Sequence, residues 1–237
     1  MNLSLQHLSK KIQQSLSVTG SKSESNRLLL LQALYPNLVL ENLSNSDDTI
    51  TMQTAINTPH GPIDIHHAGT AMRFLTAYLS TQEGKEFILT GSQRMQERPI
   101  QILVEALRQL GADIEYEKKE GYPPLKIRGK KLKGNQVTLP AHVSSQYITA
   151  LLLIAPSLPK GLTVVLEGKI TSIPYIKMSL SLLNQLGVSS SFEGNIIQAQ
   201  PVSSIKNQVA RVESDWSSAS YFYSIAALSE ESEIKIE

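Results

Sequence analysis

The chain has 237 residues, of which 41% are hydrophobic, so it is long enough to form one large domain or two ordinary ones around a proper core. Its formal net charge of +1 excludes a global attraction to nucleic acids or membranes, and any anion binding must therefore be local. The absence of cysteine excludes disulfides, thiolate metal ligands and a cysteine nucleophile, and it fits a reducing compartment.

The N-terminal segment 1–19 alternates apolar and polar positions around Leu3, Leu5, Leu16 and Val18, which predicts one or two strands. It lacks the long apolar core of a signal peptide, and no segment reaches the roughly 18 consecutive apolar residues of a transmembrane helix. We therefore expect a cytoplasmic protein without a membrane partner.

Residues 20–27 place two cations and three hydroxyl groups directly before an apolar run. The pattern predicts a helix over Asn26–Leu34, capped by Asn26 or Ser25. The free N–H groups and the dipole of a helix start favour an anion, and Lys22 and Arg27 add full charges beside them. We interpret this segment as an anion cradle. The alternative is an ordinary helix cap with a solvated lysine and arginine.

A strand over Leu38–Leu40 and a second helix over Met52–Ile56 come next, and residues 44–48 have the composition of a helix cap. Asp47 and Asp48 could form a metal-binding or acidic pair. We favour a role in complementing the helix dipole.

Residues 63–73 predict a strand that breaks at Gly69 into a third helix, where the glycine allows close approach of a ligand to the helix start. The neighbouring His66 and His67 would point to opposite faces of this strand, so we do not expect a shared metal ion. After a strand over Lys85–Thr90, the polar loop 91–98 contains two arginines that form a second candidate anion site. Alternatively, one of them only pairs with Glu97.

A helix from Pro99 to Leu110 and strands over Ile114–Tyr116 and Leu125–Arg128 follow. Cationic side chains crowd this region, and a nucleic-acid patch is one interpretation. We favour edge lysines that prevent sheet aggregation, because few aromatic residues are interleaved, and we expect no nucleic-acid partner. The cations are Lys118, Lys119, Lys126, Arg128, Lys130, Lys131 and Lys133.

The hydroxyl-rich segment 143–147 precedes an almost wholly apolar run, 148–155, which predicts a buried helix. A strand over Leu162–Leu166 and a second polar helix start at Ser172 follow, with an amphipathic helix that ends at Leu186. We expect both helices to lie inside the molecule, with sheets outside them.

Landmarks recur at an almost constant spacing, which indicates an internal repeat. The step from Pro99 to Pro174 is nearly the same as the step from Gly111 to Gly187. Each unit contains a helix, a strand, a glycine loop, a helix and two strands. The pattern predicts that Trp216–Leu228 begins another buried helix, followed by a strand over Glu233–Ile236.

These ordered segments together resemble the 3-phosphoshikimate 1-carboxyvinyltransferase (EPSP synthase) family. The resemblance implies an α/β (α+β) fold of two lobes, each built from three βαβαββ units with buried helices and outer sheets, of which one lobe is complete here. The implied domains are an N-terminal strand segment of the other lobe (1–19), a substrate-binding lobe (20–213) and a truncated start of the other lobe (214–237). The matching segments are 20–23, 26–27, 68–73, 94–99, 144–147, 174–175, 213–215 and 217–221.

The resemblance implies transfer of the enolpyruvyl group of phosphoenolpyruvate to the 5-hydroxyl of shikimate 3-phosphate, a step of the shikimate pathway toward chorismate and the aromatic amino acids. No metal or organic cofactor is implied. The residues implied to bind shikimate 3-phosphate are Ser23 and Arg27 at the carboxylate, Ser144, Ser145 and Ser172 at the phosphate, and Gln146 and Tyr175 at the ring. Those implied to bind phosphoenolpyruvate are Lys22, Gly69, Thr70, Arg94 and Gln146, with Lys22 also catalytic.

Two positions depart from the family pattern, since His67 replaces the usual asparagine and Phe74 the usual proline. The family's acid–base carboxylates are implied to lie in the second lobe. We therefore expect a fragment that is inactive alone. We also expect a monomer. A UDP-N-acetylglucosamine enolpyruvyl transferase is an alternative, which Lys22-Ser23 and the lack of cysteine disfavour. A non-catalytic phosphoester-binding module is another.

Overall fold

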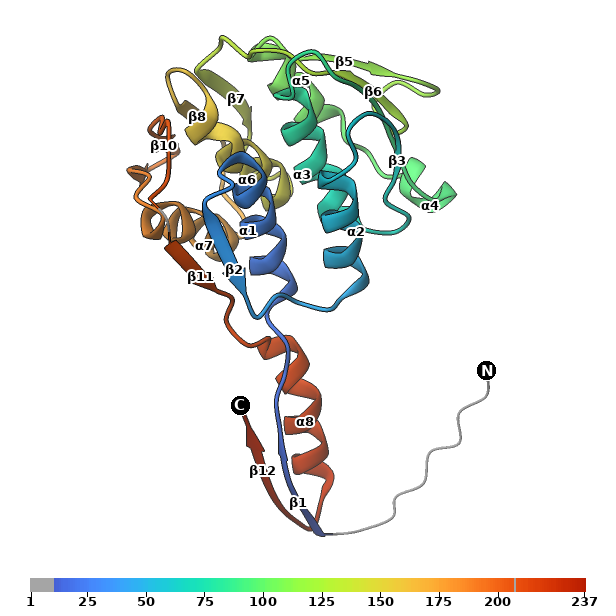
Figure 1. Ribbon diagram of the computed structural model, residues 1–237, viewed down its shortest axis with the longest axis vertical. Coiled ribbons are helices and arrows are strands. Elements are labelled where there is room, and N and C mark those ends of the chain that lie inside the picture. Colours follow the sequence, from blue (N-terminus) through green and yellow to red (C-terminus); the bar gives the residue numbers. More distant parts are fainter. Residues whose placement is uncertain (1–10, 207) are drawn as a thin grey trace.

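The computed structural model describes residues 11–206 and 208–237 (Figure 1). The strand predicted around Leu3 and Leu5 lies outside these residues. Most of the chain forms one body, and three elements from the two ends of the chain stand apart from it.

Two four-stranded sheets have the same topology, which confirms the predicted repeat. In each, the first two strands are parallel and the last two are antiparallel neighbours. The first sheet has the order β3-β4-β6-β5 and contains β3 (Gly61–Asp64), β4 (Glu86–Thr90), β5 (Asp113–Tyr116) and β6 (Leu125–Arg128). The second has the order β7-β8-β10-β9 and contains β7 (Gln136–Pro140), β8 (Leu162–Glu167), β9 (Ser190–Glu193) and β10 (Ile196–Ala199).

Equivalent helices complete the two βαβαββ units, because a parallel strand pair needs a crossover connection. In the first unit these are α3 (Gly69–Ser80) and α5 (Gln101–Gln109), with the short α4 (Gln93–Gln96) between β4 and α5. In the second they are α6 (Ser145–Ile154), extended by the 3-10 turn η1 (Ala155–Ser157), and α7 (Ile173–Gln185).

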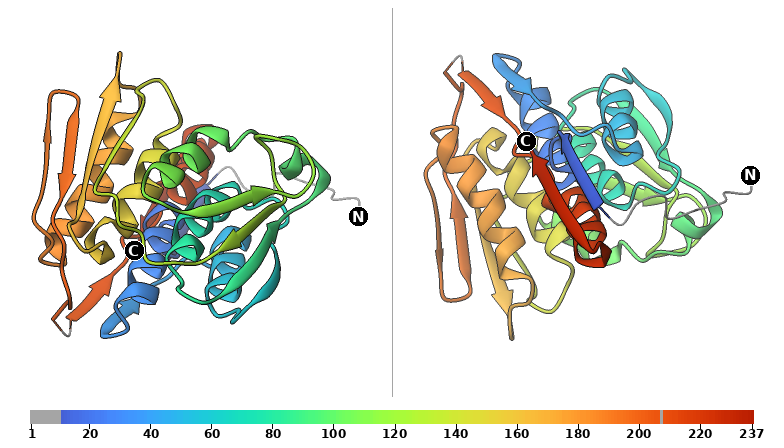
Figure 2. Two further views of the ribbon diagram at one scale, coloured as in Figure 1. Left: turned by 90° about the horizontal axis from the view of Figure 1, so that it is seen from above. Right: turned by 90° about the horizontal axis from the view of Figure 1, so that it is seen from below.

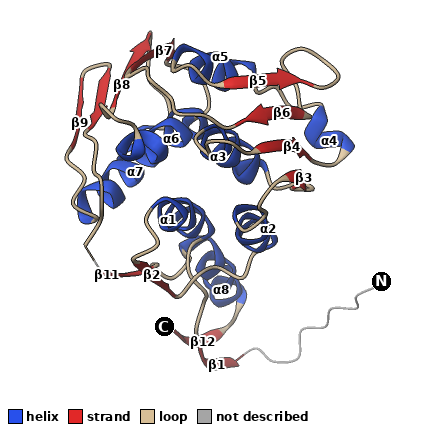
Figure 3. Ribbon diagram, turned by 45° about the horizontal axis from the view of Figure 1, so that its top comes forward, coloured by secondary structure: helices blue, strands red, loops and turns tan. Residues whose placement is uncertain are grey.

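A third group of elements joins distant parts of the chain. It contains α1 (Lys22–Leu34), β2 (Leu38–Glu41), α2 (Asp47–Ile56) and β11 (Gln208–Arg211). Strands β2 and β11 pair in parallel, although both four-stranded sheets lie between them in the sequence. This pairing brings the end of the body back to its beginning. The long helices of the body lie inside and the sheets lie outside (Figure 3).

The interior position of α6 is confirmed. Residues Leu151 to Ile154 are 0% exposed, as expected for a helix that is apolar on every side. Helix α7 buries only its inner face, through Ile176, Leu180 and Leu183, in line with its amphipathic sequence. The polar N-terminal ends of α6 and α7 therefore belong to the inner layer of helices.

Some local details of the body differ from the sequence prediction. Helix α1 begins at Lys22 with Ser21 as its N-cap, so the predicted cap at Asn26 or Ser25 is wrong. The hydroxyl of Ser25 instead accepts a hydrogen bond from the backbone N–H of Ser44 at 2.9 Å, a tertiary contact that local sequence does not reveal. Strand β7 and helix α4 were also not predicted.

Strand β1 (Lys11–Leu16), helix α8 (Trp216–Leu228) and strand β12 (Glu231–Ile236) stand apart from the body. Strands β1 and β12 pair in parallel and lie side by side in the right panel of Figure 2. The two connections to the body are bonded to each other, from Ser21 N to Glu213 O at 2.8 Å and from Asp215 N to Thr19 O at 2.9 Å. The proposed domain boundaries fall at this crossing and stay a prediction.

The predicted burial of α8 is wrong. Trp216 is 71% exposed and Leu228 is 83% exposed, and Ala219 is the buried residue of the helix. Within the described part of the chain, α8 packs mainly against β12, which covers only one side of it. No described helix has the length and apolarity needed to cross a membrane.

Candidate anion-binding site

Lys22 and Asp48 connect the starts of two helices. Lys22 is the first residue of α1, and its Nζ lies 3.8 Å from Oδ2 of Asp48 in the first turn of α2. Asp47 and Asp48 both lie in that turn, where carboxylates complement the helix dipole, as predicted. The Lys22 side chain remains 47% exposed, so its ammonium group is accessible to a ligand.

Arg27 is the most deeply buried of the predicted site residues, at 3% exposed. Its Nη1 donates to the backbone carbonyl of Ser23 at 2.6 Å, and its Nε donates to Oγ of Ser179 at 3.0 Å. The guanidinium carbon lies 5.7 Å from the centroid of the Phe74 ring, which is fully buried. Phe74, which departs from the family pattern, therefore packs against the guanidinium of Arg27 in the core.

The charge of Arg27 is poorly compensated. Burial lowers the pKa of its guanidinium to about 10, while nearby Tyr175 and Glu24 oppose this shift. Arg27 forms no ion pair with any carboxylate of the described residues. A buried cation without a counter-ion favours binding of an anion, because the anion supplies the missing charge.

Ser179 joins three helices around Arg27. Its hydroxyl group bonds to Arg27, lies 3.1 Å from Oγ1 of Thr149 in α6, and donates to the carbonyl of Tyr175 at 3.0 Å. Sequence reasoning missed Ser179 and Thr149. In the sequence, each of them is recognisable only as a small polar residue within the apolar part of a predicted helix.

The start of α6 contacts the start of α3. Ser144 caps α6, and its Oγ accepts a hydrogen bond from the backbone N–H of Gln146 at 3.3 Å. The Gln146 side chain donates to Oγ1 of Thr70 at 3.2 Å. Two predicted site residues from different repeat units are thus in direct contact, while Ser145 beside them is buried.

The start of α7 is more open. Ser172 has left-handed backbone geometry, with φ of 55°, and precedes the helix, and Tyr175 in the first turn is 49% exposed. No described side-chain contact connects either of them to Gln146, Thr70 or Arg94. The resemblance implies that all these residues bind the two substrates of one reaction, and we predict that they share one cleft.

Arg73 and Arg98 lie at the start of α3. Arg73 is 5% exposed and donates to the carbonyl of Gly69 at 2.9 Å, while its Nε has no hydrogen-bond partner among the described residues. Burial and the neighbouring Arg98 lower the pKa of Arg73, although Tyr147 partly offsets them. A Cβ at Gly69 would lie 2.6 Å from Nη1 of Arg98, so glycine permits this close packing.

A cleft opens beside these arginines, lined by His67, Arg94, Met95 and Arg98. Sequence reasoning proposed the two arginines of this loop, Arg94 and Arg98, as a candidate anion site and missed Arg73. Helical spacing could have pointed to Arg73, because it follows Gly69 by four residues and so lies on the same face of α3. The arrangement can hold an anionic group against a helix start and fixed cations.

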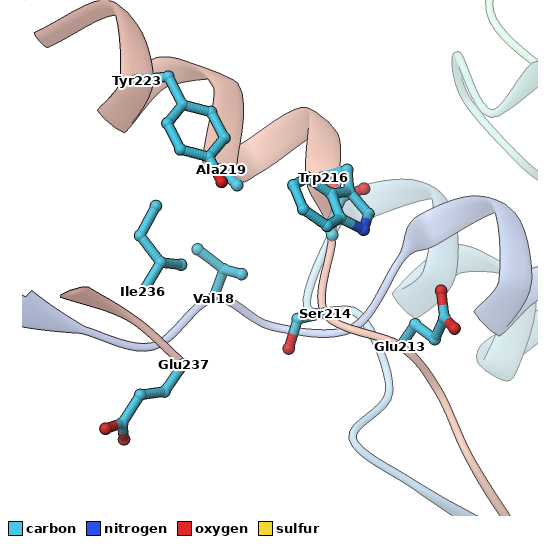
Figure 4. A pocket seen from close by; sticks show the side chains of 9 residues that line it. Val18, Glu213, Ser214, Trp216, Ala219, Tyr223, Ile236 and Glu237 are labelled. Atoms are coloured by element: carbon cyan, nitrogen blue, oxygen red, sulfur yellow. The ribbon is translucent and has the colours of Figure 1, made fainter. Parts of the chain in front are cut away.

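A separate cavity lies between the crossing segments and α8 (Figure 4). It is lined by Val18, Trp216, Ala219, Tyr223 and Ile236, together with residues 213–215 and Glu237. Asp215 caps α8 by accepting from the backbone N–H groups of Ser217 and Ser218 at 3.4 and 3.1 Å. This cavity contains none of the predicted substrate-binding residues.

Repeated βαβαββ units with inner helices, and cationic side chains at the helix starts, define an α/β protein of the enolpyruvyl transferase class. The family model for EPSP synthase (3-phosphoshikimate 1-carboxyvinyltransferase) matches residues 52–237. The chain belongs to this family.

Curated relatives agree with the family match. A 3-phosphoshikimate 1-carboxyvinyltransferase of Bacteroides fragilis is 50% identical over 230 residues, which cover 95% of this chain and 55% of the relative. Its counterpart from Colwellia psychrerythraea is 39% identical over 248 residues, covering 92% of this chain and 58% of the relative. The chain thus spans little more than half the length of these relatives.

A solved structure shows the same fold. The EPSP synthase from Acinetobacter baumannii superposes with a TM-score of 0.78 at 23% sequence identity. The superposition covers 94% of this chain and 56% of that one. The predicted fold class is therefore confirmed over nearly the whole chain.

Proposed function

We propose that the chain carries the shikimate 3-phosphate half-site of a 3-phosphoshikimate 1-carboxyvinyltransferase. The observation that carries this proposal is the buried guanidinium of Arg27, which has hydrogen bonds to Ser23 and Ser179 but no counter-ion among the described residues. A carboxylate that pairs with it gains a charge-assisted contact, worth about 1.5 to 3 kcal/mol per hydrogen bond.

In this proposal, Ser23 and Arg27 bind the carboxylate of shikimate 3-phosphate. The hydroxyl groups of Ser144, Ser145 and Ser172 bind its phosphate, where two helix starts add N–H groups and favourable dipoles. Gln146 and Tyr175 contact the ring. Fixed donors at both ends of the substrate would orient its 5-hydroxyl for the reaction.

Phosphoenolpyruvate is the second proposed substrate. Lys22, Gly69, Thr70 and Arg94 line its subsite, and Gln146 reaches it through the contact with Thr70. The cationic lining around Gly69 matches a ligand with both a carboxylate and a phosphate. Arg73 and Arg98 strengthen this charge.

The proposed reaction forms a bond between the 5-oxygen of shikimate 3-phosphate and C2 of phosphoenolpyruvate, while the 5-hydroxyl loses its proton and C3 gains one. The tetrahedral intermediate then loses phosphate and the C3 proton, which gives EPSP. Lys22 is the proposed catalytic residue on this chain, because an accessible ammonium group beside Asp48 can hold or move a proton. The resemblance assigns the acid–base carboxylates to the part of the relatives that residues 1–237 do not match.

Titration calorimetry with shikimate 3-phosphate tests the half-site, and a phosphate-release assay with both substrates tests turnover. We expect weak binding without measurable turnover. Residues 1–237 tested by themselves would not undergo the lobe closure that the resemblance implies for the whole family, and closure strengthens charged contacts because it excludes water from them. Absence of binding would contradict the half-site, and steady turnover would place the acid–base groups within residues 1–237.

A further inference from the structure

The loop that carries Arg94 is attached to the segment just before α3. Ser92 donates its backbone N–H to the carbonyl of His66 at 3.0 Å, and its Oγ lies 2.8 Å from Nδ1 of His67. The two segments pack closely, because a Cβ on Gly91 would lie only 2.7 Å from the His66 carbonyl oxygen. Movement of either segment therefore displaces the other.

Ser92 can hold one tautomer of the His67 ring by donating to it. Ser92 is the N-cap of α4, and its Oγ accepts from the backbone N–H of Met95 at 3.3 Å. A hydroxyl group that accepts in this way still has one hydrogen to donate, and Nδ1 of His67 is the acceptor within reach. The neutral ring then carries its proton on Nε2.

The contact reaches Arg94 through one turn of helix. Arg94 lies between Ser92, which caps α4, and Met95, which is 2% exposed and anchors that turn in the core. His67, Arg94 and Met95 line the same cleft. Two side-chain contacts join the α3 side of this cleft to α4, one between Ser92 and His67 and one from Nη1 of Arg73 to Sδ of Met95 at 3.8 Å.

We infer that His67 is a positioning residue for Arg94, holding the start of α4 through Ser92 so that the guanidinium stays in the cleft beside Gly69. The inference rests on the proposed function of this cleft as the phosphoenolpyruvate subsite. It also accounts for the family departure at this position, because Oδ1 of an asparagine and Nδ1 of a histidine can occupy similar places relative to the backbone.

The test compares variants that keep or remove the acceptor for Ser92. His67→Asn keeps an acceptor near the Nδ1 position, whereas His67→Ala removes it and Ser92→Ala removes its partner. His60→Ala is the matched control, because His60 is an exposed histidine in the connection between α2 and β3. Ligand-observed NMR would measure phosphoenolpyruvate affinity in the presence of saturating shikimate 3-phosphate, and ¹⁵N spectra would report the imidazole tautomers.

We expect His67→Ala and Ser92→Ala each to weaken phosphoenolpyruvate binding by about two- to tenfold, the effect of one lost hydrogen bond. Ser92→Ala also removes the cap of α4, so the double variant should bind no more weakly than Ser92→Ala, which already lacks the contact with His67. His67→Asn and His60→Ala should match the unchanged chain, and shikimate 3-phosphate affinity should not change. The ¹⁵N spectra should show the Nε2–H form of His67, with this preference lost in Ser92→Ala.

Two outcomes would overturn the inference. One is unchanged phosphoenolpyruvate affinity in both alanine variants, and the other is additive losses in the double variant. If the unchanged chain bound shikimate 3-phosphate but no phosphoenolpyruvate, the proposed subsite itself would fail, and the inference with it. Shikimate 3-phosphate binding also checks that each variant is folded.

Discussion

Glu24 lies in α1 between the two cations of the site, and its carboxylate accepts a hydrogen bond from the backbone N–H of Glu213 at 3.0 Å. Burial raises the pKa of this carboxyl, and the bond from Glu213 N–H opposes that effect. An acid whose pKa rises on folding makes the folded state less stable above that pKa. Glu24 therefore lowers stability at neutral pH while it holds the crossing segment.

Glu24→Gln should thus increase the free energy of unfolding at pH 7, because the amide oxygen can still accept from Glu213 N–H without carrying a charge. The gain should shrink as the pH falls and disappear below the ordinary glutamate pKa of 4.5, where both states of the wild type bind the proton. Urea denaturation at several pH values measures this. A gain that does not depend on pH would contradict the account, and Glu24→Ala, which lacks the acceptor, should be less stable than Glu24→Gln throughout.

Ser179 offers a second test at the level of single residues. Ser179→Ala removes the partner of both Arg27 and Thr149 in a fully buried location, so we expect a loss of about 1 to 3 kcal/mol in the free energy of unfolding. Ser181→Ala is the matched control, because Ser181 is exposed on the same helix. Equal stability of the two variants in urea denaturation would show that the Ser179 contacts contribute nothing.

The sequence indicated the cationic residues of the site but not the partners that orient them. Lys22, Arg27 and Arg94 were recognisable because charge next to a helix start has a local signature. Ser179 and Thr149 were not, because their hydrogen bonds join helices that are far apart in the sequence. Contacts of that kind depend on how the helices pack.

Among the elements, α6 and α8 have similarly apolar sequences and very different surroundings. Leu152 in α6 is 0% exposed, whereas Leu228 in α8 is 83% exposed. Leu152→Ala should lower the free energy of unfolding by about 2 to 5 kcal/mol, because it leaves a cavity in a packed interior. Leu228→Ala should change it by less than about 0.5 kcal/mol. Urea denaturation of both variants checks this, and similar effects would mean that α8 is packed in solution.

Most helices and strands could be predicted because their apolar periods are clear, and the equal order of strands in the two sheets confirms the repeat. Strand β7 was missed although its residues alternate, because it is only five residues long and ends in a proline, which rarely lies within a strand. The start of α1 was misplaced because several serines offered equivalent caps, and tertiary contacts decided among them. The prediction that α8 is buried failed, because the apolar composition of a helix does not show which other elements cover it.

At the scale of the whole molecule, β1, α8 and β12 form a small unit attached to the body by two crossing segments. Because α8 buries little surface, its amides should exchange with deuterium much faster than those of α6. Hydrogen-exchange mass spectrometry measures the difference, with the amphipathic α7 as an internal reference. Equal protection of α6 and α8 would contradict this division.

The family match, the repeat and the buried cation all lead to one central claim, which is that the described body binds shikimate 3-phosphate through Arg27. The most direct measurement is titration calorimetry of shikimate 3-phosphate with Arg27→Ala and with Arg128→Ala. Arg128 is the matched control, because it lies on the outer sheet and pairs there with Glu86, Asp113 and Glu115.

We predict that Arg27→Ala weakens binding by about 2 to 5 kcal/mol, because it removes one partner of a buried charge pair. Arg128→Ala should leave affinity unchanged. Equal affinity of Arg27→Ala and the unchanged chain for shikimate 3-phosphate would contradict the central claim and remove Arg27 from the site.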